Sequence, residues 1–444
     1  MNRISVVPEK AGKARMSILI LTYGSRGDVQ PYVALAKGLQ EVGHSVTLGT
    51  SVRFQNFVED YGIDYAYMND NLLSVIDTDE GKDLFEKGSN LFKMAWRGIK
   101  IAKKVKPAQR ALLQESWEAA QKINPDFILF HPKAGGAPHI AEKLGIGCAL
   151  VTPIPMLVPT RETRFPVFPD LGLGGWYNRA IYSLIQAATN KVWKGYIKDF
   201  RQDIDLPPVK KYDFLKMTDG ADIPVIHAHS EAVVPRPSDW PDSAQVAGYF
   251  FLDAQEEWLP PQELQDFLDA DDPPVYIGFG SMAGRDPERL AGIVVEALQK
   301  ADLRGIIATG WGGLKAKDLP DTIFKIEHAP HDWLFPKMAA VVHHGGAGTT
   351  AAGLRAGRPS IITPFFGDQS FWGERVYGLG VGPKPIPQKK LNAASLAAAM
   401  REAITNQSMI EKAEKIGEKI RNEDGVGNAI NLIEQYASDH SLYP

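Results

Sequence analysis

The residues best suited to chemistry lie between Val341 and Gln369, where a short apolar run leads into two histidines and a glycine-rich turn. The turn reads His-His-Gly-Gly-Ala-Gly from His343 to Gly348, and we expect Thr349 to open a helix of small residues. A helix that follows such a turn has free backbone N–H groups at its N-terminus, and these groups attract phosphate. The stretch therefore predicts an anion site, with the histidine N–H groups as further donors.

Two side chains that can bind hydroxyls, Asp368 and Gln369, follow the next apolar strand, Ser360–Thr363. If this strand pairs with the one before the glycine turn, its carboxyl end lies beside the anion site. A carboxylate and an amide next to a phosphate site suit a sugar that is joined to a diphosphate. The residues alone leave open which histidine contacts phosphate and whether the other is an ordinary strand-end residue.

Another candidate group lies in the turn Gly24–Asp28, which reads Gly-Ser-Arg-Gly-Asp and follows an apolar strand at Met16–Thr22. This turn lacks the third glycine of a dinucleotide-binding fingerprint, and the chain has no G-x-x-x-x-G-K-[ST] phosphate loop. By residue type alone, Asp28 is favoured as a cap of the helix expected near Val29–Val42. In the alternative, Asp28 points into a cleft from the end of the first strand and acts as a general base.

The elements around these residues predict an α/β fold with two Rossmann-like domains. The first strand, its helix and a strand at Ser45–Gly49 form a βαβ unit, which implies a parallel sheet. The pattern restarts with a strand at Pro274–Phe279 and a helix at Pro287–Lys300, after a Pro-rich boundary near residues 233–241. Further strands are expected at Phe127–Phe130, Gly147–Thr152, Ile223–Ile226, Gly305–Thr309, Ile323–Ile326 and Ala339–Val342. Two such sheets that face each other would hold a ligand at the carboxyl ends of their strands.

The chain divides accordingly into four parts, since 444 residues are too many for one core. We expect a flexible tail at residues 1–15 and an N-terminal domain at residues 16–235. A C-terminal domain is expected at residues 236–425, followed at 426–444 by a helix and tail that could pack back on the N-terminal domain.

Composition argues against several classes of protein. A net charge of −4 argues against a general nucleic-acid binder. The single cysteine, Cys148, excludes internal disulfides and a cysteine-rich metal site, and its apolar surroundings favour a buried thiol. The acidic group Asp269, Asp271 and Asp272 is favoured as a solvated linker rather than a metal site. No segment has the apolar length of a bilayer span or a secretory signal, so a cytoplasmic protein is expected.

Two further stretches bear on an apolar or membrane-bound substrate. Residues 87–110 carry eight basic side chains and no acid, with Phe92, Trp96 and Ile99 at helical spacing. The favoured interpretation is an amphipathic helix packed on its domain, and the alternative is a patch that contacts anionic membrane. The Pro-rich, apolar stretch Pro153–Pro169 is expected to be irregular, and long apolar loops of this kind are more often functional than structural.

Five motifs together resemble a known family. They are His328–Pro336, His343–Thr350, Asp368-Gln369, Gly24–Pro31 and Val233–Trp240. The first three resemble the nucleotide-sugar signature of inverting, UDP-sugar-dependent glycosyltransferases with two Rossmann-like domains, the GT-B type. The other two narrow the resemblance to sterol 3-beta-glucosyltransferases, with glycopeptide-antibiotic glycosyltransferases as relatives. The resemblance extends from Met16 to about Tyr436.

The resemblance implies that Asp28 is the catalytic base. With the resemblance taken into account, this role is preferred over the role of helix cap that residue type alone favours. It also implies that the N-terminal domain binds the acceptor and the C-terminal domain binds a UDP-sugar, without a metal or another cofactor. The donor-binding residues that it implies are Ser25, Arg26, Ser281, Trp311, Ala329, His331, His343, His344, Ala347, Gly348, Thr349, Asp368 and Gln369. Among these, Ala329, His331 and Trp311 would flank the uracil ring, and Asp368 and Gln369 would bind the sugar hydroxyls.

The motifs depart from those relatives in two places. Plant-type relatives keep a ribose-binding glutamate where this chain has Thr350-Ala351-Ala352. They also use a histidine base paired with an aspartate, where this chain offers Asp28 directly. Fungal-type relatives carry extra membrane-binding domains ahead of the catalytic unit, which we do not expect here, so the basic stretch 87–110 gains weight.

The expected activity is the transfer of glucose from UDP-glucose, as co-substrate, to a hydroxyl of an apolar acceptor, with inversion. A sterol or triterpenoid is the first choice of acceptor, and a phenolic or macrolide aglycone is the second. Two other classes stay open, a sugar-nucleotide epimerase and a non-catalytic sugar-nucleotide binding protein. The expected location is the cytoplasm, and peripheral contact with an anionic membrane through residues 87–110 is a further option.

Overall fold

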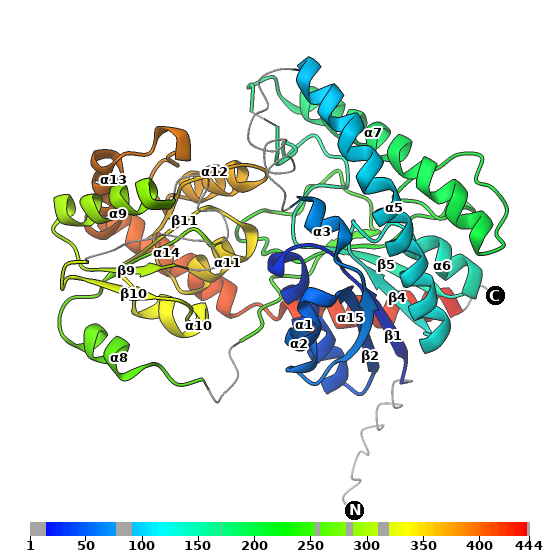
Figure 1. Ribbon diagram of the computed structural model, residues 1–444, viewed down its shortest axis with the longest axis horizontal. Coiled ribbons are helices and arrows are strands. Elements are labelled where there is room, and N and C mark those ends of the chain that lie inside the picture. The colour runs from blue at the N-terminus through cyan, green and yellow to red at the C-terminus, as the bar shows by residue number, and fades with distance from the viewer. Residues whose placement is uncertain are drawn as a thin grey trace, which may run out of the picture.

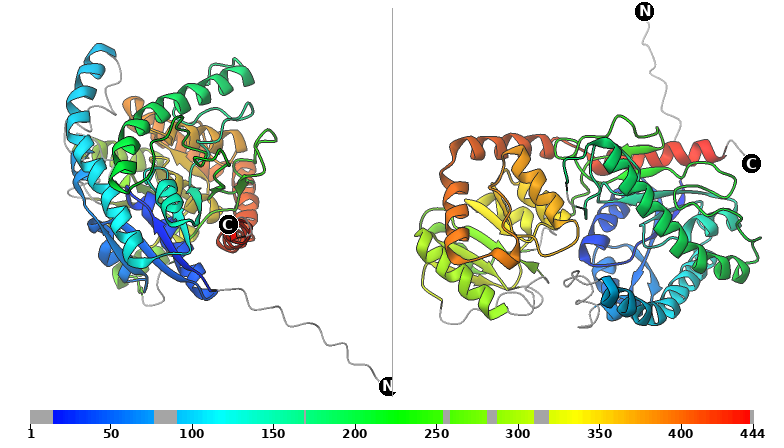
Figure 2. Two further views of the ribbon diagram at one scale, coloured as in Figure 1. Left: turned by 90° about the vertical axis from the view of Figure 1, so that its right-hand side faces the viewer. Right: turned by 90° about the horizontal axis from the view of Figure 1, so that it is seen from above.

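The computed structural model describes residues 15–76, 91–168, 170–253, 258–280, 287–309 and 319–441. Two α/β domains lie side by side, and each is built on a parallel sheet (Figure 1). The last helix of the chain returns from the second domain to the first, as the right-hand view of Figure 2 shows. The predicted α/β class with two Rossmann-like domains is confirmed.

Among the described residues, the N-terminal sheet has seven parallel strands in the order β3-β2-β1-β4-β5-β6-β7. The strands are β1 (Ser17–Leu21), β2 (Ser45–Ser51), β3 (Asp64–Met68), β4 (Phe127–Phe130), β5 (Gly147–Thr152), β6 (Val225–His227) and β7 (Ala244–Val246). The central strands β1, β4 and β5 are continuous apolar runs and almost fully buried, because helices cover both faces of the sheet.

The C-terminal sheet has five parallel strands within the described ranges, in the order β10-β9-β8-β11-β12. They are β8 (Val275–Gly278), β9 (Gly305–Ala308), β10 (Ile323–Ile326), β11 (Ala340–His343) and β12 (Ser360–Ile362). Strands β11 and β12 pair directly, with His343 opposite Ile362. The condition that brings Asp368 and Gln369 beside the glycine turn is therefore met.

Helices cover both sheets and connect their strands. In the N-terminal domain they are α1 (Arg26–Glu41), α2 (Gln55–Glu59), α3 (Asn71–Ile76), α5 (Leu91–Ile123), α6 (Ala137–Leu144) and α7 (Gly175–Asp203). In the C-terminal domain they are α8 (Gln262–Asp269), α9 (Pro287–Ala301), α10 (His331–Leu334), α11 (Ala347–Arg355), α12 (Gln369–Leu379), α13 (Ala393–Thr405) and α14 (Gln407–Arg421). The final helix, α15 (Gly425–Ser441), packs on α1 and β5 of the N-terminal domain through Ala429, Ile430 and Ile433.

The structure corrects two expected boundaries. Helix α11 begins at Ala347 with Gly346 as its N-cap, two residues before Thr349, because the small residues before Thr349 already adopt helical geometry. Strand β7 pairs with β6, so the first sheet extends beyond residue 235, where the sequence predicts the end of the N-terminal domain. The basic stretch 87–110 falls mainly on α5, but residues 87–90 and the side chains of 91–104 lie outside the described residues.

The chain passes between the two domains twice, and the two connecting segments contact each other at a pair of glycines. Gly248 lies in the segment that leaves the first sheet and has a φ angle of +110°, and Gly425 begins α15. A Cβ atom on Gly248 would lie 2.9 Å from the Cα atom of Gly425. A Cβ atom on Gly425 would lie 2.7 Å from the carbonyl carbon of Gly248 and would overlap the carbonyl oxygen of Tyr249. Side chains at this crossing would therefore force two backbones apart.

We expect Gly425→Ala to lower the free energy of unfolding by about 1–3 kcal/mol, because the added methyl group collides with backbone that cannot rotate away. Urea denaturation followed by circular dichroism measures this change. The matched control is Gly292→Ala, since Gly292 lies within α9 and a Cβ there meets no atom within 4 Å. The control should be neutral or up to about 1 kcal/mol more stable. Equal stability of the two variants would contradict the packing argument.

Candidate active site

A cleft between the two domains collects the residues singled out in the sequence. Its volume is about 3420 Å³, several times the ~300–1,000 Å³ of a typical small-molecule site. It is lined by Ser25, Arg26 and Asp28 from the N-terminal domain and by Ala329, His331, His344, Ala347, Gly348, Thr349, Asp368 and Gln369 from the C-terminal domain. Residues from both predicted sites thus share one cavity that has room for two ligands. Ser281 and Trp311 lie outside the described residues.

Asp28 sits on the first turn of α1, at the carboxyl end of β1, with its side chain 19% exposed to the cleft. Its Oδ2 atom accepts hydrogen bonds from the backbone N–H of Ser25 at 2.7 Å and from the Ser25 hydroxyl at 2.9 Å. The expected role as a helix cap is therefore real, because the carboxylate satisfies a free backbone donor at the helix start. The same contacts fix the direction of the carboxylate in the cleft.

Two residues that sequence reasoning missed, His131 and Lys133, complete the surroundings of Asp28. Nζ of Lys133 lies 3.0 Å from Oδ2 of Asp28, and Nε2 of His131 lies 3.3 Å from Oδ1. Both residues follow β4, which pairs with β1 in the sheet. Residues at the carboxyl ends of neighbouring parallel strands lie close together. A prediction that β4 is the neighbour of β1 would therefore have placed His131 and Lys133 near Asp28.

The charge of Asp28 is stabilised despite its burial. Burial by itself raises the pKa of this carboxyl, but the Lys133 ammonium and the His131 ring outweigh burial and hold the pKa well below its usual range. Burial lowers the pKa of His131, so this ring is neutral at pH 7. Nδ1 of His131 accepts the backbone N–H of Lys133 at 3.1 Å, which leaves the ring proton on Nε2, facing Asp28. His131 therefore donates to the carboxylate instead of competing for its proton.

Gly24 leaves the space in which this cluster forms. It has a φ angle of +148°, and a Cβ atom there would overlap Oδ2 of Asp28 and lie 2.7 Å from Nζ of Lys133. Larger residues are thus excluded at the first position of the Gly-Ser-Arg-Gly-Asp turn.

The two adjacent histidines occupy different environments. His343 ends β11, is fully buried, and accepts the backbone N–H of Gly345 on Nδ1 at 3.0 Å. His344 lines the cleft beside Gly346 and near Gly280. Burial lowers the pKa of His344 to about 4, so the ring is a neutral N–H donor at pH 7. Of the two, His344 is the one placed to meet a ligand.

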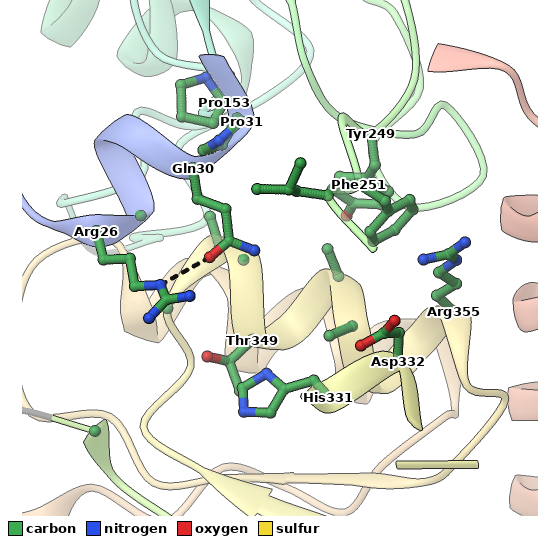
Figure 3. A pocket seen from close by; sticks show the side chains of 18 of the residues that line it. Arg26, Gln30, Pro31, Pro153, Tyr249, Phe251, His331, Asp332, Thr349 and Arg355 are labelled. Carbon is green, nitrogen blue, oxygen red and sulfur yellow. Dashed lines mark hydrogen bonds between the residues drawn. The ribbon is translucent and has the colours of Figure 1, made fainter. Parts of the chain in front are cut away.

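The N-terminus of α11 faces the same cavity. Gly346, Ala347, Gly348 and Thr349 line it, and their backbone N–H groups are those left unpaired at the start of a helix. Figure 3 shows Arg26 and Gln30 of α1 opposite Thr349 and His331, with a hydrogen bond between Nε of Arg26 and Oε1 of Gln30 at 3.0 Å. An anion at this position would meet the helix terminus from one domain and the Arg26 guanidinium from the other.

His331 and Ala329 form the wall next to that anion position. The His331 ring stacks on Phe335 with 4.2 Å between centroids, and burial lowers its pKa to about 4. A neutral ring fixed on an aromatic support, beside the buried Ala329, suits contact with a flat heterocycle better than contact with a charge.

Asp368 and Gln369 lie at the start of α12, in the cleft. Oδ2 of Asp368 accepts the indole N–H of Trp372 at 2.7 Å, and burial raises the pKa of this carboxyl. The side-chain oxygen Oε1 of Gln369 accepts the backbone N–H groups of Phe365 and Phe366, at 2.8 and 3.2 Å. Both side chains are therefore fixed by internal bonds, and these bonds do not use the amide NH₂ of Gln369.

The apolar stretch Pro153–Pro169 is irregular, as expected, over its described residues 153–168, and it reaches the C-terminal domain. Pro153 and Ile154 line the cleft. Nη2 of Arg164 lies 2.6 Å from Oε2 of Glu374, and its guanidinium lies 5.5 Å from the centre of the Phe371 ring. Both partners are on α12, so this loop contacts the helix that presents Asp368 and Gln369.

Two features are not found in the part of the chain that the structure describes. We find there no group of three or more histidine, cysteine, aspartate or glutamate side chains arranged to bind a metal ion. Within the same ranges, no helix combines the length and apolar character needed to cross a bilayer.

Comparison with known families and structures gives a consistent match. Residues 18–157 match the glycosyltransferase family 28 N-terminal domain, and residues 294–425 match the erythromycin biosynthesis protein CIII-like C-terminal domain. In fold, the chain is similar to the glycosyltransferase of kitacinnamycin (TM-score 0.69, 18% identity, 95% of this chain and 99% of that one). It is also similar to the glycosyltransferase VinC in complex with DTDP (TM-score 0.66, 17% identity, 96% of this chain and 100% of that one).

Curated relatives are more similar in sequence. The chain is 37% identical to the sterol 3-beta-glucosyltransferase UGT80B1 of Arabidopsis thaliana, over 95% of this chain and 68% of the relative. It is 38% identical to the sterol 3-beta-glucosyltransferase of Komagataella phaffii, over 96% of this chain but only 35% of that longer protein. Since the match to UGT80B1 covers nearly all of this chain and two thirds of the relative, the chain belongs to the sterol 3-beta-glucosyltransferase family of glycosyltransferases.

Proposed function

We propose that the protein transfers glucose from UDP-glucose to the hydroxyl of a sterol or related triterpenoid, with inversion at the anomeric carbon. The observation that carries this proposal is the position of Asp28 and the α11 N-terminus in one cleft, on opposite domains. A base on one side and a diphosphate site on the other are the two parts that an in-line displacement requires. The expected acceptor is a flat apolar alcohol, in keeping with the Pro153–Pro169 loop and the size of the cleft.

In the proposed mechanism, the acceptor hydroxyl attacks the anomeric carbon while its proton passes to Asp28. Oδ2 is already occupied by Ser25 and Lys133, so Oδ1 is the oxygen that takes the proton. Asp28 is the better candidate for the base than His131, because Asp28 lines the cleft, whereas the side chain of His131 is only 6% exposed and donates toward the carboxylate.

The leaving UDP would be stabilised by dipoles and N–H donors. The backbone N–H groups of Ala347 to Thr349 would bind the β-phosphate, and His344 would add a neutral donor. Arg26 approaches from the other domain, while His331 and Ala329 would hold the uracil ring. Asp368 and Gln369 would bind the sugar hydroxyls. No metal is required in this scheme, since these groups meet the leaving-group charge.

The proposal places the enzyme at a membrane surface, because a sterol acceptor resides in a bilayer. Contact through the basic stretch 87–110 stays a prediction, since most of its side chains lie outside the described residues. A phenolic or macrocyclic aglycone is the second choice of acceptor. Incubation of the protein with UDP-glucose and a panel of detergent-dispersed sterols, flavonoids and macrolides, followed by mass spectrometry, tests the acceptor. Glucosides of other classes without any steryl glucoside would contradict the first choice.

Removal of the base should separate chemistry from binding. We expect Asp28→Asn to lower kcat by about a hundredfold to ten-thousandfold, because the amide cannot take the acceptor proton. The dissociation constant of UDP, measured by calorimetry, should change little, since the asparagine oxygen can still cap α1. Turnover close to that of the unmodified enzyme would rule out Asp28 as the base.

The contact with Lys133 should set the pH range of activity. In Lys133→Met the cation that lowers the pKa of Asp28 is lost while burial, which raises it, remains. The carboxylate is then protonated at higher pH, so the acidic limb of the kcat/KM profile should move to higher pH by at least about one unit. Lys143→Met is a suitable control, because Lys143 donates to the backbone oxygen of Asp205 and neither residue lines the cleft. Superimposable profiles for the two variants would show that Lys133 does not tune the base.

The two histidines should respond differently to substitution. We expect His344→Ala to lower kcat by about tenfold to a hundredfold with little change in melting temperature, because a donor to the leaving group is lost. His343→Ala should instead lower the melting temperature, since a fully buried side chain that accepts the Gly345 N–H is removed. Steady-state kinetics and thermal unfolding of both variants check this. The reverse pattern would assign the ligand contact to His343.

A further inference from the structure

Exposed apolar side chains gather on and beside α7. Eleven large hydrophobic side chains are exposed among the described residues, and six of them lie between positions 167 and 192. These six are Val167, Leu171, Leu173, Trp176, Leu184 and Val192. Scattered exposed apolar residues are ordinary on a soluble protein, but such a concentration marks an interaction surface.

The apolar residues of α7 occupy its outer face. Trp176 is 67% exposed, Leu184 60% and Val192 59%, and the exposed alanines 180, 187 and 188 lie between them. Tyr182 and Phe200, on the opposite side of the helix, are buried in the domain. Figure 1 shows α7 at the outer edge of the N-terminal domain, next to α5 and away from the C-terminal domain. The face is therefore open along most of the helix.

The charges on α7 have one sign as far as Lys198, and Asp170 is an exposed acid just before the helix. Between Gly175 and Lys198 the chain has four cationic residues and no acidic residue. The four are Arg179, Lys191, Lys194 and Lys198, and all are exposed. The first acids, Asp199 and Asp203, are paired with Lys106 and Arg110 of α5. A second copy of this chain that docked through the same face would bring the same positive charge and be repelled, whereas an anionic surface would be attracted.

The inner face of α7 holds the loop that leads into the cleft. The Tyr182 ring packs on Phe165 with 5.2 Å between centroids. Nη1 of Arg179 donates to the carbonyl oxygen of Pro159 at 2.8 Å, and Nδ2 of Asn178 donates to that of Arg161 at 3.0 Å. Whatever binds the outer face of α7 is therefore separated from the loop of residues 153–168 only by this helix.

We propose that the outer face of α7 docks the protein on an anionic lipid bilayer. Trp176, Leu184 and Val192 enter the boundary between headgroups and acyl chains, and the lysines reach the lipid phosphates. The inference rests on the surface of α7 itself and meets the proposed function only because a bilayer is where a sterol acceptor is dissolved.

Flotation of the full chain with vesicles tests the docking directly. One set of vesicles is pure phosphatidylcholine, and the other contains about 30% phosphatidylserine. The test variant is Trp176→Ser/Leu184→Ser, and the matched control is Leu259→Ser/Tyr377→Ser, which removes two exposed apolar side chains from the other domain. We expect the unmodified protein and the control to bind anionic vesicles at least about tenfold more than neutral ones, and the test variant to lose at least about tenfold of this binding.

Three results would overturn the proposal. They are no binding of the unmodified protein to anionic vesicles, equal binding of the test variant and the control, and a concentration-dependent dimer that only the test variant abolishes. Glucosyl transfer to a detergent-dispersed sterol, measured alongside, keeps the two proposals separate. Transfer should be equal in all three proteins, so its absence would count against the proposed function and leave the vesicle result intact.

Discussion

A buried carboxylate must be paired or protonated, and the arrangement of this cleft follows from how Asp28 is paired. One oxygen binds the start of α1 and Lys133, and the other faces His131. Three parts of the first domain meet at this point, namely the end of β1, the start of α1 and the segment after β4. Gly24 keeps the space open, and the side chain is thereby held charged and directed into the cleft. A base that is already ionised and fixed needs little reorganisation when an acceptor arrives.

The second domain supplies complementary partners for a ligand across the gap. The start of α11 and His344 offer N–H donors, while Asp368 and Gln369 offer an acceptor and a donor that internal bonds hold in place. Two crossings join the domains, and they touch at Gly248 and Gly425 without intervening side chains. The contact of Arg164 with Glu374 adds a link between the apolar loop of one domain and helix α12 of the other. The apolar acceptor and the nucleotide sugar would therefore be held by parts that contact each other.

Much of this arrangement could be predicted from the sequence, where local patterns carry the information. Strands β4, β5 and β10 have the predicted bounds because each is an apolar run between turn residues. Asp28 could be named because its turn is distinctive, and both of its interpretations have support in its contacts. His131 and Lys133 were missed, since a His-Pro-Lys sequence indicates a site only once β4 is known to lie beside β1. Strand β7 was missed because three residues of mixed polarity give no period. The outer face of α7 was missed because exposure depends on what packs against the helix.

The central claim is that one displacement across the cleft joins glucose to a sterol hydroxyl. The most direct measurement is the anomeric configuration of the product formed from UDP-α-glucose and a detergent-dispersed sterol, read by proton NMR. A single displacement with Asp28 as base predicts the β-glucoside. An α-glucoside, or an altered UDP-sugar formed without acceptor, would contradict this account.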